Sequence, residues 1–117
     1  MDFNTKDSGE RKEFTTGMQR DVETGKPSFD LMLPLEVPYD QQMLTRFAKL
    51  LSRGAEKYDE RNWEKAETME ELSRFKRSAA RHFFQWMTGE LDEDHASAVY
   101  FNIMGAEMVK FKIKNNG

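Results

Sequence analysis

Residues 68–106, TMEELSRFKRSAARHFFQWMTGELDEDHASAVYFNIMGA, decide the fold because they hold two helix patterns separated by a short acidic break. Thr68 and Glu71 form the T-x-x-E pattern of a capping box, in which each side chain satisfies a backbone N–H of the other residue. Apolar residues then recur on one side of a helix, at Leu72, Phe75, Ala79, Phe83 and Met87. The pattern predicts a helix that begins after Thr68 and ends near Gly89.

A further helix is predicted after the break, beginning around Asp92 or Glu93. Acidic residues are favourable in this position because they cap a helix N-terminus and stabilise its dipole. Its expected buried face consists of Ala96, Val99, Ile103, Ala106 and Val109, and its negative C-terminal end is expected beside Lys110, Lys112 and Lys114. Because the connection is short, the two helices should be antiparallel neighbours.

An upstream helix is predicted from Asp40, a suitable N-cap, to Gly54, which stands where a helix commonly ends. Its apolar stripe comprises Met43, Leu44, Phe47, Leu50 and Leu51. No strand pattern competes, so the predicted fold class is all-α, a small helical bundle. Three narrow apolar stripes make a thin core, and we expect oligomerisation into a four-helix-type bundle to complete it.

Residues 1–38 differ from residues 39–117 because they hold all three prolines and lack helical periodicity. A long irregular segment in a small protein is usually functional or disordered. We therefore expect two parts, an irregular N-terminal arm over 1–38 and a helical domain over 39–117. The arm is expected to pack over something, such as another subunit.

Composition excludes several classes of protein. The net charge is −3, which gives no general attraction to nucleic acid or to an anionic membrane. The absence of cysteine excludes disulfides and thiolate zinc sites. No apolar run approaches membrane-spanning length, and the N-terminus lacks the apolar core of a signal peptide. We expect a soluble, cytoplasmic protein.

The acidic break between these two helices is rich in titratable side chains. Capping the next helix explains Asp92 and Glu93 adequately. Glu90 is less easily explained, because the dipole disfavours a negative charge at the end of a helix. Carboxylates select hard cations such as Mg²⁺ or Mn²⁺, so Glu90 and Asp94 are the principal metal candidates, with His95 or Asp92 as a further ligand.

Two polar residues interrupt the apolar stripes. His82 shares one side of its helix with Glu90, and it is equally well interpreted as a structural histidine and as a base or ligand. Asn102 lies among apolar residues in mid-helix, where a buried amide must find partners. It is interpreted first as a clamp on a loop, and second as a group that recognises the polar edge of a ligand.

Basic residues gather in the non-periodic stretches TGKPSFD (24–30) and RGAEKYDERNW (53–63), beside glycines and aromatic rings. Phosphate recognition needs several cations with glycines that let the backbone approach, and aromatic rings can stack on a base. Neither stretch is a Walker A loop. The residues themselves therefore indicate only an all-α protein with features of metal binding and phosphate handling.

Three segments together resemble a known family: RKEFTTGMQRDVETGKPSFDLMLP (11–34), LLSRGAEKYDERNWEKA (50–66) and RSAARHFFQWMTGELDEDHASAVYFNI (77–103). Their order and spacing are similar to those of the phage and bacterial dATP/dGTP diphosphohydrolases. The resemblance implies a MazG-like all-α nucleoside triphosphate pyrophosphatase that depends on Mg²⁺ or Mn²⁺ and forms dimers or tetramers. It also implies cleavage of purine deoxynucleoside triphosphates to monophosphate and pyrophosphate, in the host cytoplasm if the protein is phage-encoded.

The resemblance carries over to individual positions. In the arm it covers Arg20, Asp21, Lys26 and Asp30; in the central segment Gly54, Lys57, Tyr58, Asn62 and Trp63; and in the third Arg81, His82, Glu90, Asp92, Glu93, Asp94, His95 and Asn102. Better-characterised MazG-like enzymes hold metal through an E-x-x-E and a later E-x-x-D motif. This sequence has no clean pair of those motifs.

The resulting hypothesis divides the site residues by role. The expected catalytic residues are His82, Glu90 and Asp94, the expected metal ligands are Glu90, Asp94, Asp92 and His95, and the expected substrate-binding residues are Arg20, Lys26, Lys57, Tyr58, Arg61, Asn62, Trp63, Arg81 and Asn102. A carboxylate or His82 would accept the proton of the attacking water. The alternative hypothesis is a non-enzymatic helical adaptor from a phage, in which the acidic cluster is only a helix cap.

Overall fold

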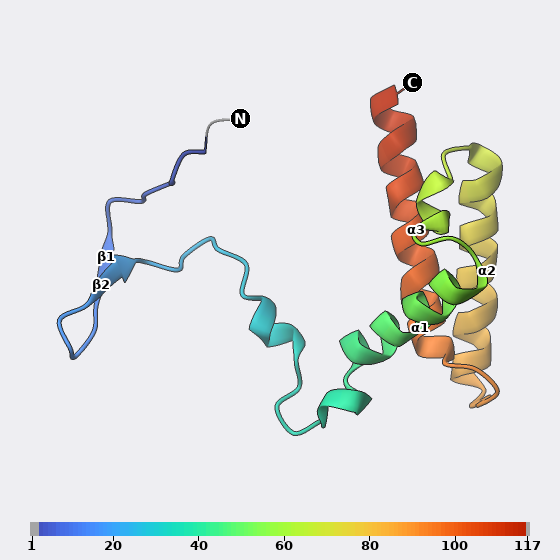
Figure 1. Cartoon of the computed structure of the whole chain (residues 1–117), viewed down its shortest axis with the longest axis horizontal. Coiled ribbons are helices and arrows are strands. Elements are labelled where there is room, and N and C mark those ends of the chain that lie inside the picture. Colours follow the sequence, from blue (N-terminus) through green and yellow to red (C-terminus); the bar gives the residue numbers. More distant parts are fainter. Residues whose placement is uncertain (1–2, 117) are drawn as a thin grey trace. The chain divides into compact units, whose positions relative to one another are not determined.

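The computed structural model describes residues 3–116. They form two compact units that divide between Met32 and Leu33. Residues 33–38, which the sequence assigns to the arm, therefore group with the helical unit by their contacts. Figure 1 shows the arm in blue and the helical unit from green to red. Within the described residues, no helix is both long enough and apolar enough to cross a membrane.

The arm contains a short β-hairpin that sequence periodicity did not predict. Strands β1 (Arg11–Glu13) and β2 (Gln19–Asp21) pair in an antiparallel register that places Arg11 opposite Asp21. Gly17, with a φ of 90°, closes the turn through a hydrogen bond to the Phe14 carbonyl. Almost all of this hairpin is exposed, so it has no buried face to produce an alternating pattern. The arm also contains the 3₁₀ helix η1 (Phe29–Met32).

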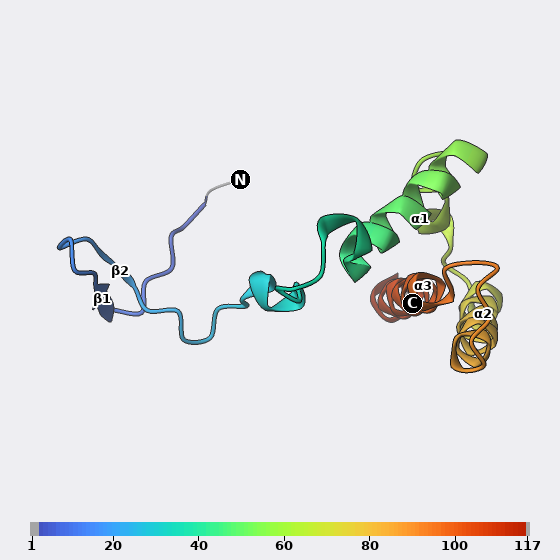
Figure 2. The same cartoon turned by 90° about the horizontal axis from the view of Figure 1, so that it is seen from below.

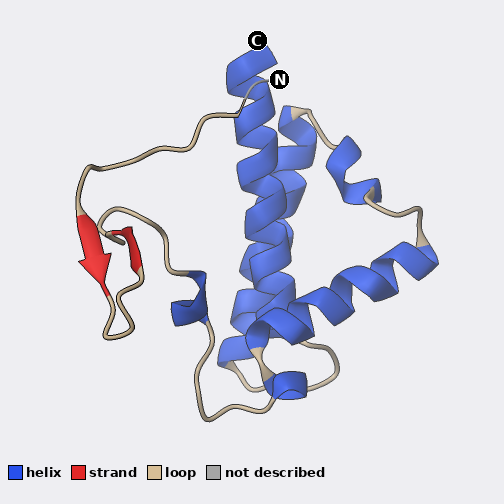
Figure 3. Ribbon diagram, turned by 60° about the vertical axis from the view of Figure 1, so that its left-hand side comes forward, coloured by secondary structure: helices blue, strands red, loops and turns tan. Residues whose placement is uncertain are grey.

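The helical unit confirms the predicted all-α class. Its elements are η2 (Tyr39–Gln41), α1 (Met43–Lys57), η3 (Asn62–Lys65), α2 (Met69–Met87) and α3 (His95–Asn116). Helices α2 and α3 lie side by side and antiparallel, as the short connection predicts, and α1 crosses the end of this pair where α3 begins (Figures 2 and 3).

Helix α2 begins as predicted, because both halves of the capping box are present. The Glu71 N–H donates to Thr68 Oγ1 at 3.2 Å, and the Thr68 N–H donates to Glu71 Oε1 at 3.1 Å. The predicted bounds of α1 are wrong. Asp40 lies in η2, and the helix begins after Gln42, whose side-chain amide donates to the Pro34 and Val37 carbonyls. Gly54 lies inside α1, and its carbonyl accepts the Tyr58 N–H that ends the helix.

The core sits between α2, α3 and the segment that follows η3. It consists of the buried residues Ala66, Leu72, Ala106 and Val109, with Phe75, Met108 and Ile113 packed against them. Gly105 is buried because the Phe75 ring lies directly against its backbone. The predicted buried faces were wrong at Ile103, Phe83 and Met87, each of which is at least half exposed. Small residues of α3, including Ala98 and Gly105, are buried.

Candidate functional site

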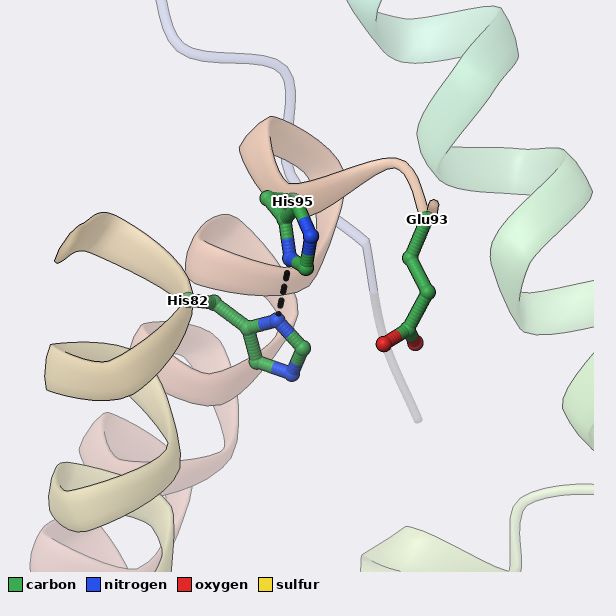
Figure 4. Close-up of side chains that lie close together, drawn as sticks. All are labelled: His82, Glu93 and His95. Atoms are coloured by element: carbon green, nitrogen blue, oxygen red, sulfur yellow. Dashed lines mark hydrogen bonds between the residues drawn. The ribbon is translucent and has the colours of Figure 1, made fainter. Parts of the chain in front are cut away.

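Two buried histidines face each other where α2 ends and α3 begins. The Nδ1 atoms of His82 and His95 are 2.8 Å apart, and both side chains are more than nine-tenths buried (Figure 4). The Nε2 atom of His95 lies 2.7 Å from Asp92 Oδ1. If Asp92 is ionised and His95 neutral, His95 donates Nε2–H to Asp92 and accepts at Nδ1 from His82. The three residues then form one directional chain, in which His82 keeps a lone pair on Nε2.

The electrostatics of this chain favour an uncharged His82 and an ionised Asp92. Burial lowers the pKa of His82, and the positive charge of Arg81 lowers it further, although Glu93 and Asp92 oppose the shift. The hydrogen bond from His95 lowers the pKa of Asp92. At neutral pH His82 is therefore an uncharged imidazole and Asp92 a carboxylate. Arg81 is exposed on α2 beside His82, at the edge of this cluster.

Two groups of side chains at this junction could hold a cation. His82, Glu93 and His95 form one, and Glu90, Asp92 and His95 form the other; in each, one ligand atom per residue lies within 4.8 Å of the others. Figure 4 shows the carboxylate of Glu93 extending toward the histidine pair. Glu90 is exposed and accepts a hydrogen bond from Gln85 at 3.1 Å. These mixed nitrogen and oxygen donors fit Mn²⁺, and Mg²⁺ less well because Mg²⁺ prefers oxygen alone.

Asp94 lies at the same junction, but its carboxylate is already engaged. Arg46 of α1 donates from Nε to Oδ2 at 2.9 Å and from Nη2 to Oδ1 at 2.6 Å. Asp94 also accepts from the backbone N–H and the hydroxyl of Ser97, which is the pattern of a helix N-cap. Arg46 lowers the pKa of Asp94 to about 2. Sequence reasoning missed Arg46 because it lies 48 positions from its partner, in a stripe otherwise explained by apolar packing.

The central segment (50–66) lines a pocket of about 470 Å³ between α1, the loop after it, η3 and α3. Four of the predicted substrate-binding residues line it, namely Tyr58, Arg61, Asn62 and Trp63. The Trp63 ring meets Phe101 of α3 edge to face at a centroid distance of 5.9 Å. Arg61 has a φ of 57°, a left-handed conformation that non-glycine residues seldom adopt and that occurs often at functional sites.

A second pocket of about 450 Å³ lies on the other side of Trp63 and Asn62, between η3, α2 and α3. Asn102 lines this pocket, together with Ser78 and the cations Lys65 and Arg74. The Asn102 amide donates to the Ala98 carbonyl of its own helix at 2.8 Å, so it does not clamp a loop through that bond. Seven residues separate Asn102 from His95, which places it about 10 Å along the same face of α3.

The remaining predicted residues are dispersed. Lys57 extends over the ring of its neighbour Tyr58, with Nζ 5.3 Å from the centroid. Arg20 and Lys26 line a hollow of about 710 Å³ within the arm. There Asp21 lies 3.6 Å from both Lys26 Nζ and Arg11 Nη1, and it accepts hydrogen bonds from Ser8. The predicted site residues are thus brought together as three groups, namely the junction, the two pockets around Trp63, and the arm.

Comparison with known protein families gives a match over most of the chain. The family described as dATP/dGTP diphosphohydrolase, N-terminal, matches residues 16–115, which include all three groups. Neither the curated proteins nor the solved structures contain a significant match.

Proposed function

The chain belongs to the dATP/dGTP diphosphohydrolase family, and we propose that it hydrolyses purine deoxynucleoside triphosphates to the monophosphate and pyrophosphate with a divalent cation. The observation that carries the proposal is the position of two groups along α3. The titratable junction lies at the N-terminus of α3, and the aromatic pockets around Trp63 lie further along the helix. This arrangement suits a ligand with a charged end and a planar end.

The reaction breaks the bond between the α-phosphorus and its bridging oxygen and forms a bond from water to the same phosphorus. In the proposal, carboxylate and imidazole groups of the junction would hold Mg²⁺ or Mn²⁺ at the triphosphate. A bound cation would neutralise phosphate charge and polarise the α-phosphorus. Because Asp94 is paired with Arg46, we assign it a positioning role as the cap that orients the start of α3.

The proton of the attacking water needs an acceptor. Glu90 suits this role because its carboxylate is exposed and lies in the group with Asp92 and His95. His82 has a lowered pKa and is uncharged at neutral pH, so it supports the site as a neutral donor or acceptor. The proton therefore passes from water to a carboxylate as the new P–O bond forms, and pyrophosphate leaves with the bridging oxygen.

The planar end of the substrate is assigned to the pockets around Trp63. Trp63 or Tyr58 stacks on the purine, and Asn102 and Asn62 offer amides to its polar edge. Phosphate charge is assigned to Lys57, Arg61 and Arg81 of the helical unit. The role of Arg20 and Lys26 of the arm in phosphate binding stays a prediction from the resemblance. Lys57 and Arg61 belong to the same short segment as the aromatic residues, which supports this division of roles.

Association between subunits is part of the proposal. The C-terminal half of α2 exposes a cluster of large apolar side chains, Phe83, Phe84, Trp86 and Met87, each at least half exposed. Soluble monomers seldom expose such patches, so we assign this surface to a homodimer or tetramer. Light scattering coupled to size exclusion should give an oligomer mass. A Phe84→Glu variant should shift that mass toward the monomer.

The function is tested by measuring pyrophosphate release from dGTP and dATP with Mg²⁺ or Mn²⁺, with dCTP as the control substrate. We expect release from at least one purine nucleotide, and a loss of at least about 100-fold in Glu90→Gln if Glu90 is the general base. Inactivity on every purine nucleotide would instead support the helical adaptor. Full activity of Glu90→Gln would overturn the assignment of the base.

Binding of the base can be followed separately by tryptophan fluorescence, because the chain has two tryptophans. A nucleotide analogue that resists hydrolysis should quench Trp63 in a Trp86→Phe variant. The same analogue should leave the fluorescence of Trp63→Phe unchanged, since Trp86 lies on the exposed face of α2. Equal quenching in both variants would contradict the assignment of the pocket.

A further inference from the structure

We propose that His82 Nδ1, His95 Nδ1 and the Glu93 carboxylate form a binding site for a divalent transition-metal cation, and that Asp92 orients His95 instead of binding the metal. The inference deepens the proposed function by identifying the cation that the junction prefers. Metal binding is measured in the absence of nucleotide, so a failure to bind metal can be distinguished from a failure to hydrolyse nucleotide.

The first argument is the approach of the two imidazoles. Their Nδ1 atoms face each other at 2.8 Å, and only one of them can carry a proton between them. Two nitrogens bound to one cation at about 2.1 Å, at a right angle, lie about 3 Å apart. A cation in place of this proton would lie off the line between the two nitrogens, so the nitrogens keep about the same separation and each ring turns to direct its lone pair at the cation. His82, which carries its proton on Nδ1 in the metal-free chain, then carries it on Nε2.

The second argument is the hydrogen bond between His95 and Asp92. Histidines that bind metals almost always donate their other ring N–H to a carboxylate or carbonyl, which fixes the tautomer and aims the free lone pair. His95 Nε2 makes this bond to Asp92 Oδ1 at 2.7 Å, so its Nδ1 lone pair points to His82. For the alternative group of Glu90, Asp92 and His95, Asp92 would have to give up this orienting role.

The third argument is the balance of burial and charge. Both histidines are buried, whereas Glu93 is exposed, so the site has a closed nitrogen side and an open oxygen side. The open side leaves coordination positions for water or a substrate phosphate. The charges of Glu93 and Asp92 favour a cation, and that of Arg81 opposes it. Imidazole ligands select Mn²⁺, Co²⁺ and Zn²⁺ over Mg²⁺, and among these the affinity rises from Mn²⁺ to Zn²⁺.

The chain has two histidines, so their ring ¹⁵N resonances can be assigned with His82→Gln and His95→Gln variants and then followed in the wild-type protein. Addition of Zn²⁺ should shift the Nδ1 resonances of both rings. His95 Nε2 should stay protonated, and His82 Nε2, which holds a lone pair in the metal-free chain, should become protonated. A metal-induced loss of the proton at His95 Nε2, or no shift at either ring, would overturn the proposal. Because the titration uses the wild-type chain and one variant suffices for the assignment, the measurement stands even if the other histidine variant does not fold.

Isothermal titration calorimetry of variants with Mn²⁺ then tests which carboxylate of the junction binds the metal. We expect Glu93→Gln to weaken binding at least about tenfold, and Asp92→Asn to weaken it about 10- to 100-fold through the loss of orientation. Glu90→Gln serves as the matched control, because it removes an adjacent carboxylate that the proposal leaves outside the site. Stronger weakening in Glu90→Gln than in Glu93→Gln would assign the metal to the other group.

Discussion

Arg46 of α1 and Asp94 at the start of α3 are joined by two hydrogen bonds, Nε to Oδ2 at 2.9 Å and Nη2 to Oδ1 at 2.6 Å. This forked pair connects two elements that the Phe47–Tyr100 edge-to-face contact also joins, at a centroid distance of 4.6 Å. Because Asp94 also caps α3, one carboxylate sets both the position of α1 and the start of the helix that carries His95.

The Arg46–Asp94 pair should make stability depend on pH in acid. The pKa of Asp94 is lowered from 3.8 to about 2, so its contribution is complete above about pH 4 and is lost as pH falls toward 2. Allowing for partial exposure of Arg46, we expect Asp94→Asn to cost about 1–2 kcal/mol at pH 7. Urea denaturation should show this difference shrinking between pH 4 and pH 2.

The same pair can be isolated by a double-mutant cycle with Arg46→Met. A coupling energy near zero would show that Asp94 acts only as a cap. Asp40→Asn is a suitable control, because Asp40 lies on the exposed η2 turn that precedes α1.

Gly105 should not tolerate a methyl group. A Cβ there would lie closer than 3.0 Å to the Phe75 ring, so in Gly105→Ala the ring or the helices must shift, which should cost about 1–3 kcal/mol. Gly54→Ala is the matched control, because it lies inside α1 and a Cβ there would meet no described atom within 4 Å. Thermal unfolding should show Gly54→Ala to be neutral or more stable, by up to about 1 kcal/mol.

The capping box at the start of α2 should contribute measurably to stability. Thr68→Ala removes the acceptor of the Glu71 N–H and should lower the free energy of unfolding by about 1 kcal/mol. Ser73→Ala, an exposed change within the same helix, is expected to be neutral or slightly stabilising. Equal loss in the two variants would mean that the box is not the origin of the effect.

Lys112 should affect nucleotide binding through its hydrogen bonds to the segment that carries Trp63. Its Nζ donates to the Ala66 carbonyl at 3.0 Å and to the Glu64 carbonyl, which attaches η3 and Trp63 to α3. Lys112→Met should cost about 1–2 kcal/mol. It should also raise the KM for the purine nucleotide more than it lowers kcat. Lys114→Met, on an exposed position of the same helix, should change neither constant.

Sequence patterns predicted the structure correctly where it depends on residues that are close together in the chain. The capping box lies within four residues, so Thr68 and Glu71 predicted the start of α2 directly. The short break likewise predicted that α2 and α3 are antiparallel neighbours. The predicted start of α1 failed because the side chain of Gln42 reaches back to two carbonyls, and the side chain of Asp40 is not the cap. The exposed hairpin was missed because it has no buried face.

The sequence by itself determined the helix order, the acidic break and the presence of His82 and His95 near one junction. Only the tertiary structure decided that these histidines face each other, that Asp92 contacts His95, and that Arg46 engages Asp94. The physical reason is distance along the chain. Helical periodicity fixes which residues share a face, but the rotation of α2 against α3, which places the Phe75 ring against Gly105, decides which side chains meet.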